Sequence, residues 1–403
     1  MFCPEILAPA GNLFKLQTAV RYGADAVYIA GQEFGLRSAA DNFTVREIYK
    51  GCAYAHERGA KVYLVLNGFL FDEELQRLPG FLEQIADAGI DAAIVSDLGV
   101  LRTVREHSGI TLHLSTQTST INRFAARFWR GEGVRRIVLG REVTIEQAAT
   151  IKEAAGVEVE MFVHGAMCMA YSGHCTISNY TAGRDSNRGG CIQSCRFAYS
   201  LSRERTGAGP EDTLLSAKDL RGIDVLHLFA AHGIDSLKIE GRMKSPLYVA
   251  TTVRAYRLAR RALLEGLEPD PELPRELEAM GHRDYSEGNL TLPAGDDATF
   301  HQESALPQTH QMAGYVVERK AGEYLALLLL NPLHKGEPLE LLAEDGGNLP
   351  LDTHAMEDLR GMPLAKAAPN RVVLVPDRPG AGEHLILRKP IDVEAHRHSV
   401  LAV

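Results

Sequence analysis

Four of the chain's six cysteines fall within 28 residues, a density that points to metal or redox chemistry. They are Cys168, Cys175, Cys191 and Cys195, with six, fifteen and three residues between them, in a segment rich in Gly, Ser and Asn. That composition predicts a loop rather than a helix or a strand. The sequence shows no secretion signal, so we expect a reducing cytoplasmic compartment, where clustered thiols are metal ligands or redox groups more often than disulfides.

The spacing of these cysteines leaves two kinds of metal group open. Zinc sites usually contain cysteines in closely spaced pairs, and only Cys191 and Cys195 form such a pair. An iron-sulfur cluster held by four thiolates tolerates irregular spacing and suits a loop that can wrap an object larger than one ion, although neither common ferredoxin spacing is present. The spacing therefore favours an iron-sulfur cluster, with zinc as the lesser alternative. Cys3 and Cys52 resemble ordinary buried thiols.

The elements that must position this loop follow a repeating pattern. Seven times a Gly, an apolar residue and a polar residue precede an apolar run, which is the join expected between a helix and a buried parallel strand. With the segment 5–7 in front, these runs predict eight strands, with helical periodicity between them, and therefore a (β/α)8 TIM-like barrel. A doubly wound open sheet is the competing fold, but no Gly-x-Gly-x-x-Gly follows the first strand. The seven runs are 26–29, 61–66, 92–95, 111–114, 136–139, 157–163 and 236–239.

Polar side chains follow nearly all of these predicted strands. Catalytic groups of such barrels lie at the carboxyl ends of the strands, so these residues are candidates for the site. Some of them could simply cap the next helix, and Asp97 and Asn67 are the clearest examples. The candidates are Asn67, Asp97, Gln117, Arg141, His164, Glu240, Arg242 and Lys244.

The connection after the seventh strand is far longer than the usual two to six residues, which is typical of a functional loop. We predict a cysteine loop over 164–216, with a hairpin in its second half, followed by a helix over 217–231 and an eighth helix over 247–264. The barrel thus occupies 1–265, a linker or excursion rich in Pro, Glu and Asp occupies 266–308, and short alternating runs predict a small all-β barrel domain over 309–403.

The overall charge gives little support for nonspecific binding to polyanions, because the net charge is −9. Five arginines of the cysteine loop could nevertheless form a local basic face, and a solvated surface is an equal interpretation of them. The sequence contains no apolar run long enough to span a membrane. The five are Arg184, Arg188, Arg196, Arg203 and Arg205.

Three stretches resemble the collagenase-like peptidase family of unknown catalytic type, a family U peptidase. They are 160–178, which contains the first two loop cysteines; 7–11 together with 22–28; and 236–245. The resemblance runs from residue 4 to about 290, and the β-rich tail is similar to that family's C-terminal domain. Length and a single barrel make the chain most similar to members that hydroxylate tRNA.

This resemblance implies an iron-sulfur-dependent hydroxylation of the wobble uridine in tRNA to 5-hydroxyuridine, with prephenate required as co-substrate. It also implies that the four loop cysteines hold the 4Fe-4S cluster and that the partner is a tRNA anticodon stem-loop. From their positions at strand ends, we expect His164 and Glu240 to transfer protons. The remaining candidates would bind substrate: Asn67, Asp97 and Gln117 by hydrogen bonds, and Arg141, Arg242 and Lys244 by charge.

Two other functions remain open. The family name suggests a collagenase-like peptidase, but the sequence has no zincin, serine-hydrolase or P-loop signature, and four clustered thiols are better explained as ligands than as one nucleophile. The second alternative is a cluster-bearing accessory protein in RNA or quinone hydroxylation.

Overall fold

The computed structural model describes residues 2–36, 41–200, 211–212, 215–293, 295 and 308–391. The chain forms two compact units: the first comprises Met1–Met243, Ala259–Pro269 and Arg283–Ala305, and the second the remaining segments. Among the described residues, no helix combines the length and the apolar character needed to cross a membrane.

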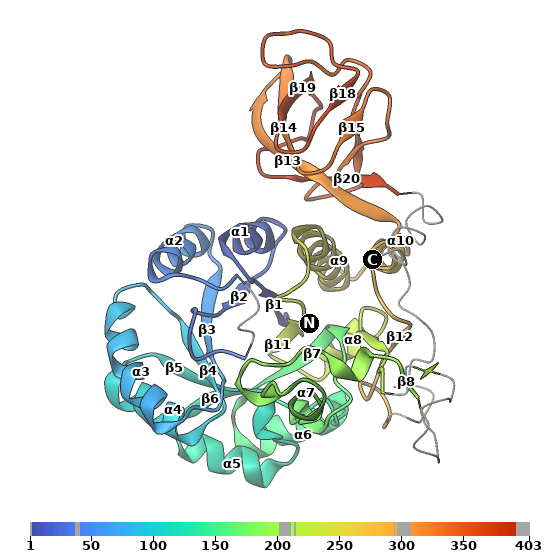
Figure 1. Ribbon diagram of the computed structural model, residues 1–403. Coiled ribbons are helices and arrows are strands. Elements are labelled where there is room, and N and C mark those ends of the chain that lie inside the picture. Colours follow the sequence, from blue (N-terminus) through green and yellow to red (C-terminus); the bar gives the residue numbers. More distant parts are fainter. Residues whose placement is uncertain are drawn as a thin grey trace. The chain divides into compact units, whose positions relative to one another are not determined.

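Eight parallel strands of the first unit close into a barrel, which confirms the predicted fold (Figure 1). The last of them, β11, pairs with β7 on one side and with β1 on the other, and this pairing closes the ring. The strands are β1 (Glu5–Pro9), β2 (Ala26–Ile29), β3 (Lys61–Leu66), β4 (Ala92–Val95), β5 (Thr111–Leu114), β6 (Val134–Val138), β7 (Glu158–Ala166) and β11 (Ser236–Ile239).

Helices connect these strands and surround the ring. Two of them begin with capping boxes, one formed by Thr44 and Glu47 and the other by Thr144 and Gln147. Gly156 ends the latter with a φ of 65°, the left-handed conformation expected from the repeated Gly pattern. The helices are α1 (Leu13–Arg21), α2 (Val45–His56), α3 (Asp72–Gln84), α4 (Leu98–His107), α5 (Arg123–Gly131), α6 (Ile145–Ala155) and α8 (Leu226–Ala231). The helix α9 (Pro246–Leu264) follows β11 and is divided between the two units.

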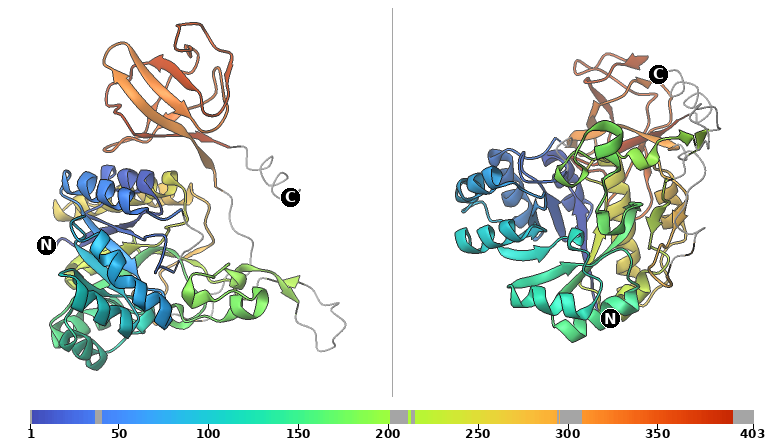
Figure 2. Two further views of the ribbon diagram at one scale, coloured as in Figure 1. Left: turned by 60° about the vertical axis from the view of Figure 1, so that its left-hand side comes forward. Right: turned by 60° about the horizontal axis from the view of Figure 1, so that its bottom comes forward.

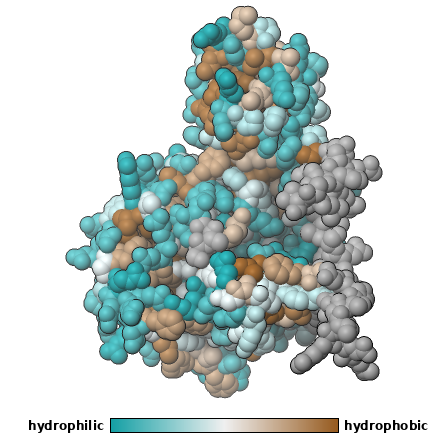
Figure 3. Space-filling model, viewed as in Figure 1, coloured by the Kyte–Doolittle hydropathy of each residue, from teal (hydrophilic) through white to brown (hydrophobic). Residues whose placement is uncertain are grey.

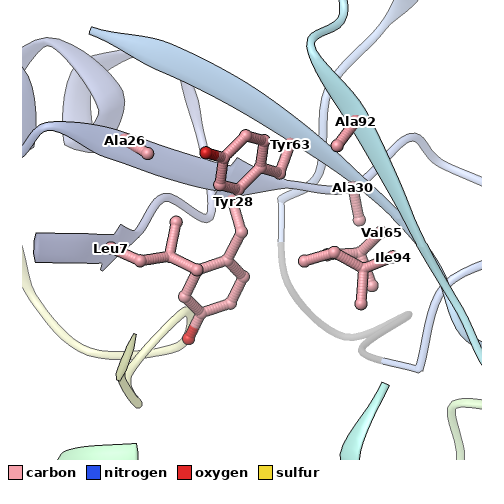
Figure 4. Packing of buried hydrophobic residues seen from close by; sticks show 8 residues of the cluster. All are labelled: Leu7, Ala26, Tyr28, Ala30, Tyr63, Val65, Ala92 and Ile94. Atoms are coloured by element: carbon pink, nitrogen blue, oxygen red, sulfur yellow. The ribbon is translucent and has the colours of Figure 1, made fainter. Parts of the chain in front are cut away.

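The barrel interior is apolar on the side of its first four strands. There, small and large side chains alternate, so Ala26 and Ala92 leave room for the rings of Tyr28 and Tyr63 (Figure 4). The remaining members of this buried cluster are Leu7, Ala30, Val65 and Ile94. This half resembles the layered packing that usually fills such barrels.

The interior also contains a group of buried charges, which the sequence analysis did not predict. Glu160 is fully buried and accepts a 2.7 Å hydrogen bond from Lys238, while Arg136 lies 3.5 Å from Glu160 and 2.5 Å from Glu5. Burial alone would raise the pKa of Glu160, but Lys238 and Arg136 outweigh it and lower that pKa. Each buried charge thus has an opposite partner, without which it would be strongly destabilising.

A neutral histidine lies close to these buried charges. His113 is 4% exposed, and its ring meets the ring of Tyr63 edge-on with centroids 4.8 Å apart. Burial, assisted by the positive charge of Arg136, lowers the pKa of His113 to about 3. The imidazole is therefore uncharged at any physiological pH.

The predicted helix over 217–231 is wrong in its first half. Residues Asp219–Arg221 form β10, which pairs antiparallel with the end of β7, and only Leu226–Ala231 is helical. The strand β12 (Tyr285–Ser286) pairs with β10, so the segment predicted as a linker or excursion folds back onto the barrel there. Arg283 stabilises this arrangement, because it forms a buried ion pair with Asp219 at 3.1 Å.

The second unit contains an antiparallel sheet, as predicted for the C-terminal segment. Its strand order is β17-β16-β20-β13-β14-β19, built around the long strand β13, whose register shifts twice against its neighbours. A short helix, α10 (Glu272–Glu278), lies in the segment predicted as a linker. The strands are β13 (His310–Lys320), β14 (Tyr324–Leu329), β16 (Glu340–Leu341), β17 (Leu349–Pro350), β19 (Val372–Pro376) and β20 (Ile386–Pro390), with β15 (Leu333–His334) and β18 (Lys366–Ala367) forming a separate pair.

Candidate functional site

The cysteine loop leaves the carboxyl end of β7 and extends beyond one end of the barrel (Figure 2). Its composition predicted a loop without helices, whereas the structure shows short helical turns joined by irregular segments. A two-stranded hairpin follows, β8 (Tyr199–Ser200) with β9 (Glu211–Asp212), while 201–210 and 213–214 of the predicted hairpin, with Arg203 and Arg205, lie outside the described residues. The turns are η2 (Tyr171–Gly173), α7 (Ile177–Ala182), η3 (Ser186–Arg188) and η4 (Ser194–Arg196).

The first anchor of this loop is at the end of β6. The carboxylate of Glu142 accepts two hydrogen bonds from Ser172, one from its backbone N–H at 2.7 Å and one from its hydroxyl at 2.8 Å. Ser172 is 1% exposed and has a φ of 47°, a conformation that costs free energy for a non-glycine residue. Because Ser172 lies between Cys168 and Cys175, Glu142 fixes the part of the loop that carries these two thiols.

The second anchor is at the end of β5, and the third is at the end of β3. The ring nitrogen Nε2 of His174 contacts the carbonyl oxygen of Gln117, which lies in the turn η1 (Thr116–Thr118). Arg188 donates to the carboxylate of Glu74 at 2.8 and 2.9 Å and also to the carbonyl oxygen of Phe69. The loop thus reaches from β7 across the carboxyl ends of three other strands, where active sites of (β/α)8 barrels lie.

All six cysteines are free thiols, and the four of the loop are partly buried. Burial raises the pKa of the Cys195 thiol, and the nearby thiols of Cys168 and Cys191 raise it further. Outside the loop, burial raises the pKa of Cys52 to about 12, as expected for an unreactive core thiol. Cys3 is exposed, so the prediction that it is buried is wrong.

Two amide side chains lie at the strand ends beneath this loop. Asn67 donates from Nδ2 to the hydroxyl of Ser115 at 3.3 Å, which orients its carbonyl oxygen. Gln117 is 5% exposed, and an added Cβ at Gly173 of the loop would lie 3.8 Å from its side chain. Among the described residues, the buried oxygens Oδ1 of Asn67 and Oε1 of Gln117 have no hydrogen-bond partner, so each is an acceptor without a donor.

The cationic candidates separate into different surroundings. The guanidinium of Arg141 stacks 3.8 Å from the ring centroid of Phe162, whereas Arg242 is 4% exposed and donates from Nη2 to Asn42 at 3.1 Å. Lys244 belongs to the second unit, where its ammonium group donates to the carbonyl of Gly281 at 3.2 Å. The structure therefore places Arg141 and Arg242 among the strand ends of the barrel unit, while Lys244, two residues after Arg242, belongs to the other unit.

The two residues predicted to transfer protons are neighbours through the backbone. Glu240 follows β11, and its N–H donates to the carbonyl of His164 at 2.9 Å. The imidazole of His164 is 1% exposed and lies 5.5 Å from the ring of Tyr285 on β12. Asp97 caps α4 by accepting the N–H of Val100 at 3.1 Å, which is the structural role that the sequence left open for it.

The candidates predicted from the sequence do not include Glu142. Its function as an anchor depends on a partner thirty residues later, which no local pattern marks. The interior charges left a clearer signal, because Glu158 and Glu160 alternate along β7 and share one face of that strand, before its register against β11 shifts between Phe162 and His164.

These features define a (β/α)8 barrel protein whose carboxyl-terminal face carries an anchored four-cysteine loop. The chain belongs to peptidase family U32, whose profile matches residues 11–299. The family resemblance predicted from the sequence is thus confirmed.

Three relatives show how far this similarity extends. A tRNA hydroxylation protein P1 from Bacillus subtilis (strain 168) is 41% identical over 373 residues, covering 88% of this chain and 86% of that protein. A tRNA hydroxylation protein P from Escherichia coli (strain K12) is 32% identical over 446 residues, covering 98% and 95%. A 23S rRNA 5-hydroxycytidine C2501 synthase from Escherichia coli (strain K12) is 38% identical over 351 residues, covering 84% and 52%.

Proposed function

We propose that this protein hydroxylates C5 of the wobble uridine of tRNA, with a 4Fe-4S cluster on the four loop cysteines and with prephenate as co-substrate. The names of its relatives support an enzyme that hydroxylates RNA, since they describe hydroxylation of tRNA and synthesis of 5-hydroxycytidine in rRNA. The observation that carries the proposal is the anchoring of the cysteine loop across four strand ends of the barrel.

The donor set consists of four thiols in one loop, which suits an iron-sulfur cluster held by four thiolates. Cys168, Cys175, Cys191 and Cys195 would hold the cluster, which supplies electron-transfer chemistry that side chains lack.

The residues beneath the loop would bind and orient the reactants. The carbonyl oxygen of Asn67 is held by the hydrogen bond to Ser115 and would accept the N3–H of uracil. Gln117 would contact the base from the adjacent strand end, after the nucleotide leaves its stack. Arg141 would pair with a carboxylate of prephenate or with an RNA phosphate, because a guanidinium binds both through paired hydrogen bonds.

The proton-transfer roles of His164 and Glu240 belong to the same proposal. Glu240 is half-buried at the end of β11 and His164 is buried at the end of β7, so both lie at the face that the loop covers. Arg242, whose guanidinium is held by Asn42, would add positive charge at this face and thereby favour an anionic co-substrate.

A strain that lacks the gene and is complemented with this chain tests the proposal. We expect tRNA from the complemented strain to contain 5-hydroxyuridine derivatives, and a Cys191→Ser chain to restore none of them. In parallel, protein purified without oxygen should show a broad visible absorbance with iron and sulfide bound. A colourless, zinc-containing protein with intact cysteines would rule out the cluster, and unchanged tRNA nucleosides would rule out the activity.

The peptidase alternative rests on the name of the family. A cysteine nucleophile requires a nearby base, yet His174 lies against the backbone carbonyl of Gln117. Cleavage of unfolded or collagen-like chains by the purified protein, retained in a Cys191→Ser variant, would favour the peptidase. If the purified protein contains an intact cluster but does not hydroxylate tRNA, an accessory protein would be favoured instead.

A further inference from the structure

The described part of the cysteine loop, residues 164–200, buries its serines and exposes its aromatic side chains. Ser172, Ser178 and Ser194 are each 1% exposed. The hydroxyls of Ser178 and Ser194 lie 3.2 Å apart, and Thr181 lies 2.7 Å from Ser194. This is the reverse of ordinary burial, in which serine lies outside and aromatic residues lie inside.

Three large aromatic side chains of the loop face solvent instead. Tyr180 on α7 is 89% exposed, Tyr171 is 52% exposed, and Phe197 is 47% exposed. Phe71, at the beginning of α3, adds a ring that is 67% exposed, and the guanidinium of Arg188 lies 3.9 Å from its centroid. Apolar residues reach the surface of this unit among hydrophilic ones (Figure 3). Single exposed apolar residues are common, but several in one anchored loop indicate a binding surface.

The loop is also locally basic in an acidic protein. Between residues 164 and 200 there are three arginines, Arg184, Arg188 and Arg196, against the single acid Asp185, which gives three minus one, or +2 with His neutral. The whole chain has a net charge of −9. Arg188 is paired with Glu74 of α3, so Arg184 and Arg196 are the charges of the loop that would attract an anionic partner.

We propose that Tyr171, Tyr180, Phe197, Arg184 and Arg196 form a stacking surface for unpaired nucleotides of RNA next to the target base. Aromatic rings and guanidinium planes stack on the faces of unpaired bases, while arginine charges contact the phosphates. A protein partner could also use tyrosine and arginine, but the local positive charge favours a polyanion. This inference rests on the proposed function, since it identifies the surface that would hold the RNA.

Binding of a synthetic tRNA anticodon stem-loop to the purified full-length protein, measured by fluorescence anisotropy, tests the inference. Tyr180→Ala should weaken binding by about 5- to 150-fold, the range expected for one lost base stack. Arg184→Glu should weaken binding and reduce the slope of log affinity against log salt by about one. Tyr49→Ala and Arg46→Glu on α2 are matched controls, because both residues are exposed on a barrel helix, and both variants should bind RNA like the wild type.

Thermal unfolding of every variant establishes that the fold is retained, and Tyr180→Phe should restore binding because the ring is kept. Unchanged RNA affinity in both loop variants would overturn the inference, even if they lost binding to a protein. If that result came with normal hydroxylation of tRNA by the wild type, the proposed function would stand and only the surface would be wrong. If the loop variants lose RNA binding but the wild type restores no hydroxylated tRNA, the surface stands and the proposed function fails.

Discussion

The buried imidazole of His113 should make the barrel less stable as the pH is lowered. Replacing His113 should remove this part of the pH dependence. Its pKa in the folded protein is about 3, whereas an unfolded histidine titrates near 6.5. The folded pKa is the lower one, so protonation favours the unfolded state. The stabilising contribution is complete above about pH 6.5 and is lost as the pH falls towards 3.

The size of this effect follows from the difference between the two pKa values. Each pH unit below 6.5 costs about 1.4 kcal/mol until the folded group titrates, so lowering the pH from 8 to 5 should cost the wild type about 2 kcal/mol from His113 alone. No screening correction is needed, because the side chain is 4% exposed.

Urea denaturation of the wild type and of His113→Leu at pH 8 and pH 5 measures the effect. The loss of unfolding free energy between the two pH values should be about 2 kcal/mol smaller in the variant. If His113→Leu folds poorly, His113→Asn serves the same purpose, because it also cannot titrate. His107→Leu, at the exposed end of α4, is the control and should keep the pH dependence of the wild type. Equal pH dependence in the wild type and in both His113 variants would refute the buried neutral histidine.

Two further predictions concern the anchor and the buried charges. Glu142→Ala removes both acceptors of Ser172, so amide hydrogen exchange over residues 170–176 should become about 30- to 1000-fold faster, the equivalent of about 2–4 kcal/mol for two hydrogen bonds to a carboxylate. Glu146→Ala, at an exposed position, should leave the exchange rate unchanged. An unchanged exchange rate in Glu142→Ala would contradict the anchoring role of Glu142. Lys238→Met leaves Glu160 without its closest partner and should lower the free energy of unfolding, measured by urea denaturation, by about 3–5 kcal/mol. Adding Glu160→Gln should recover part of that loss. A double variant no more stable than Lys238→Met would argue against the ion pair.

The barrel could be predicted because its signals are local. Each Gly that ends a helix and each apolar run that follows it lie within a few residues of one another, and the capping boxes at Thr44 and Thr144 span only one turn. The position of the cysteine loop followed from counting strands. Strand ends shifted by only a few residues, as in β7, where pairing with β10 extends the strand to Ala166.

The features that could not be predicted all depend on long-range partners. Strand β10 has only three residues, and it forms because the extended end of β7 and the short β12 lie on either side of it. The anchoring role of Glu142 requires Ser172, and the role of Asp219 requires Arg283. The same limit applied to the loop surface, since an exposed Tyr180 and a buried tyrosine look alike in a sequence.

The buried ion network has a consequence for how the chain folds. Glu5 precedes Arg136 in the chain and pairs with it, while Lys238, more than two hundred residues after Glu5, supplies a second cation for Glu160. A partly synthesised barrel that lacks β11 would bury Glu160 with a missing partner, so closure before residue 239 is unfavourable. Because β11 both closes the ring and supplies Lys238, we expect ring closure and the burial of Glu160 to occur together during folding.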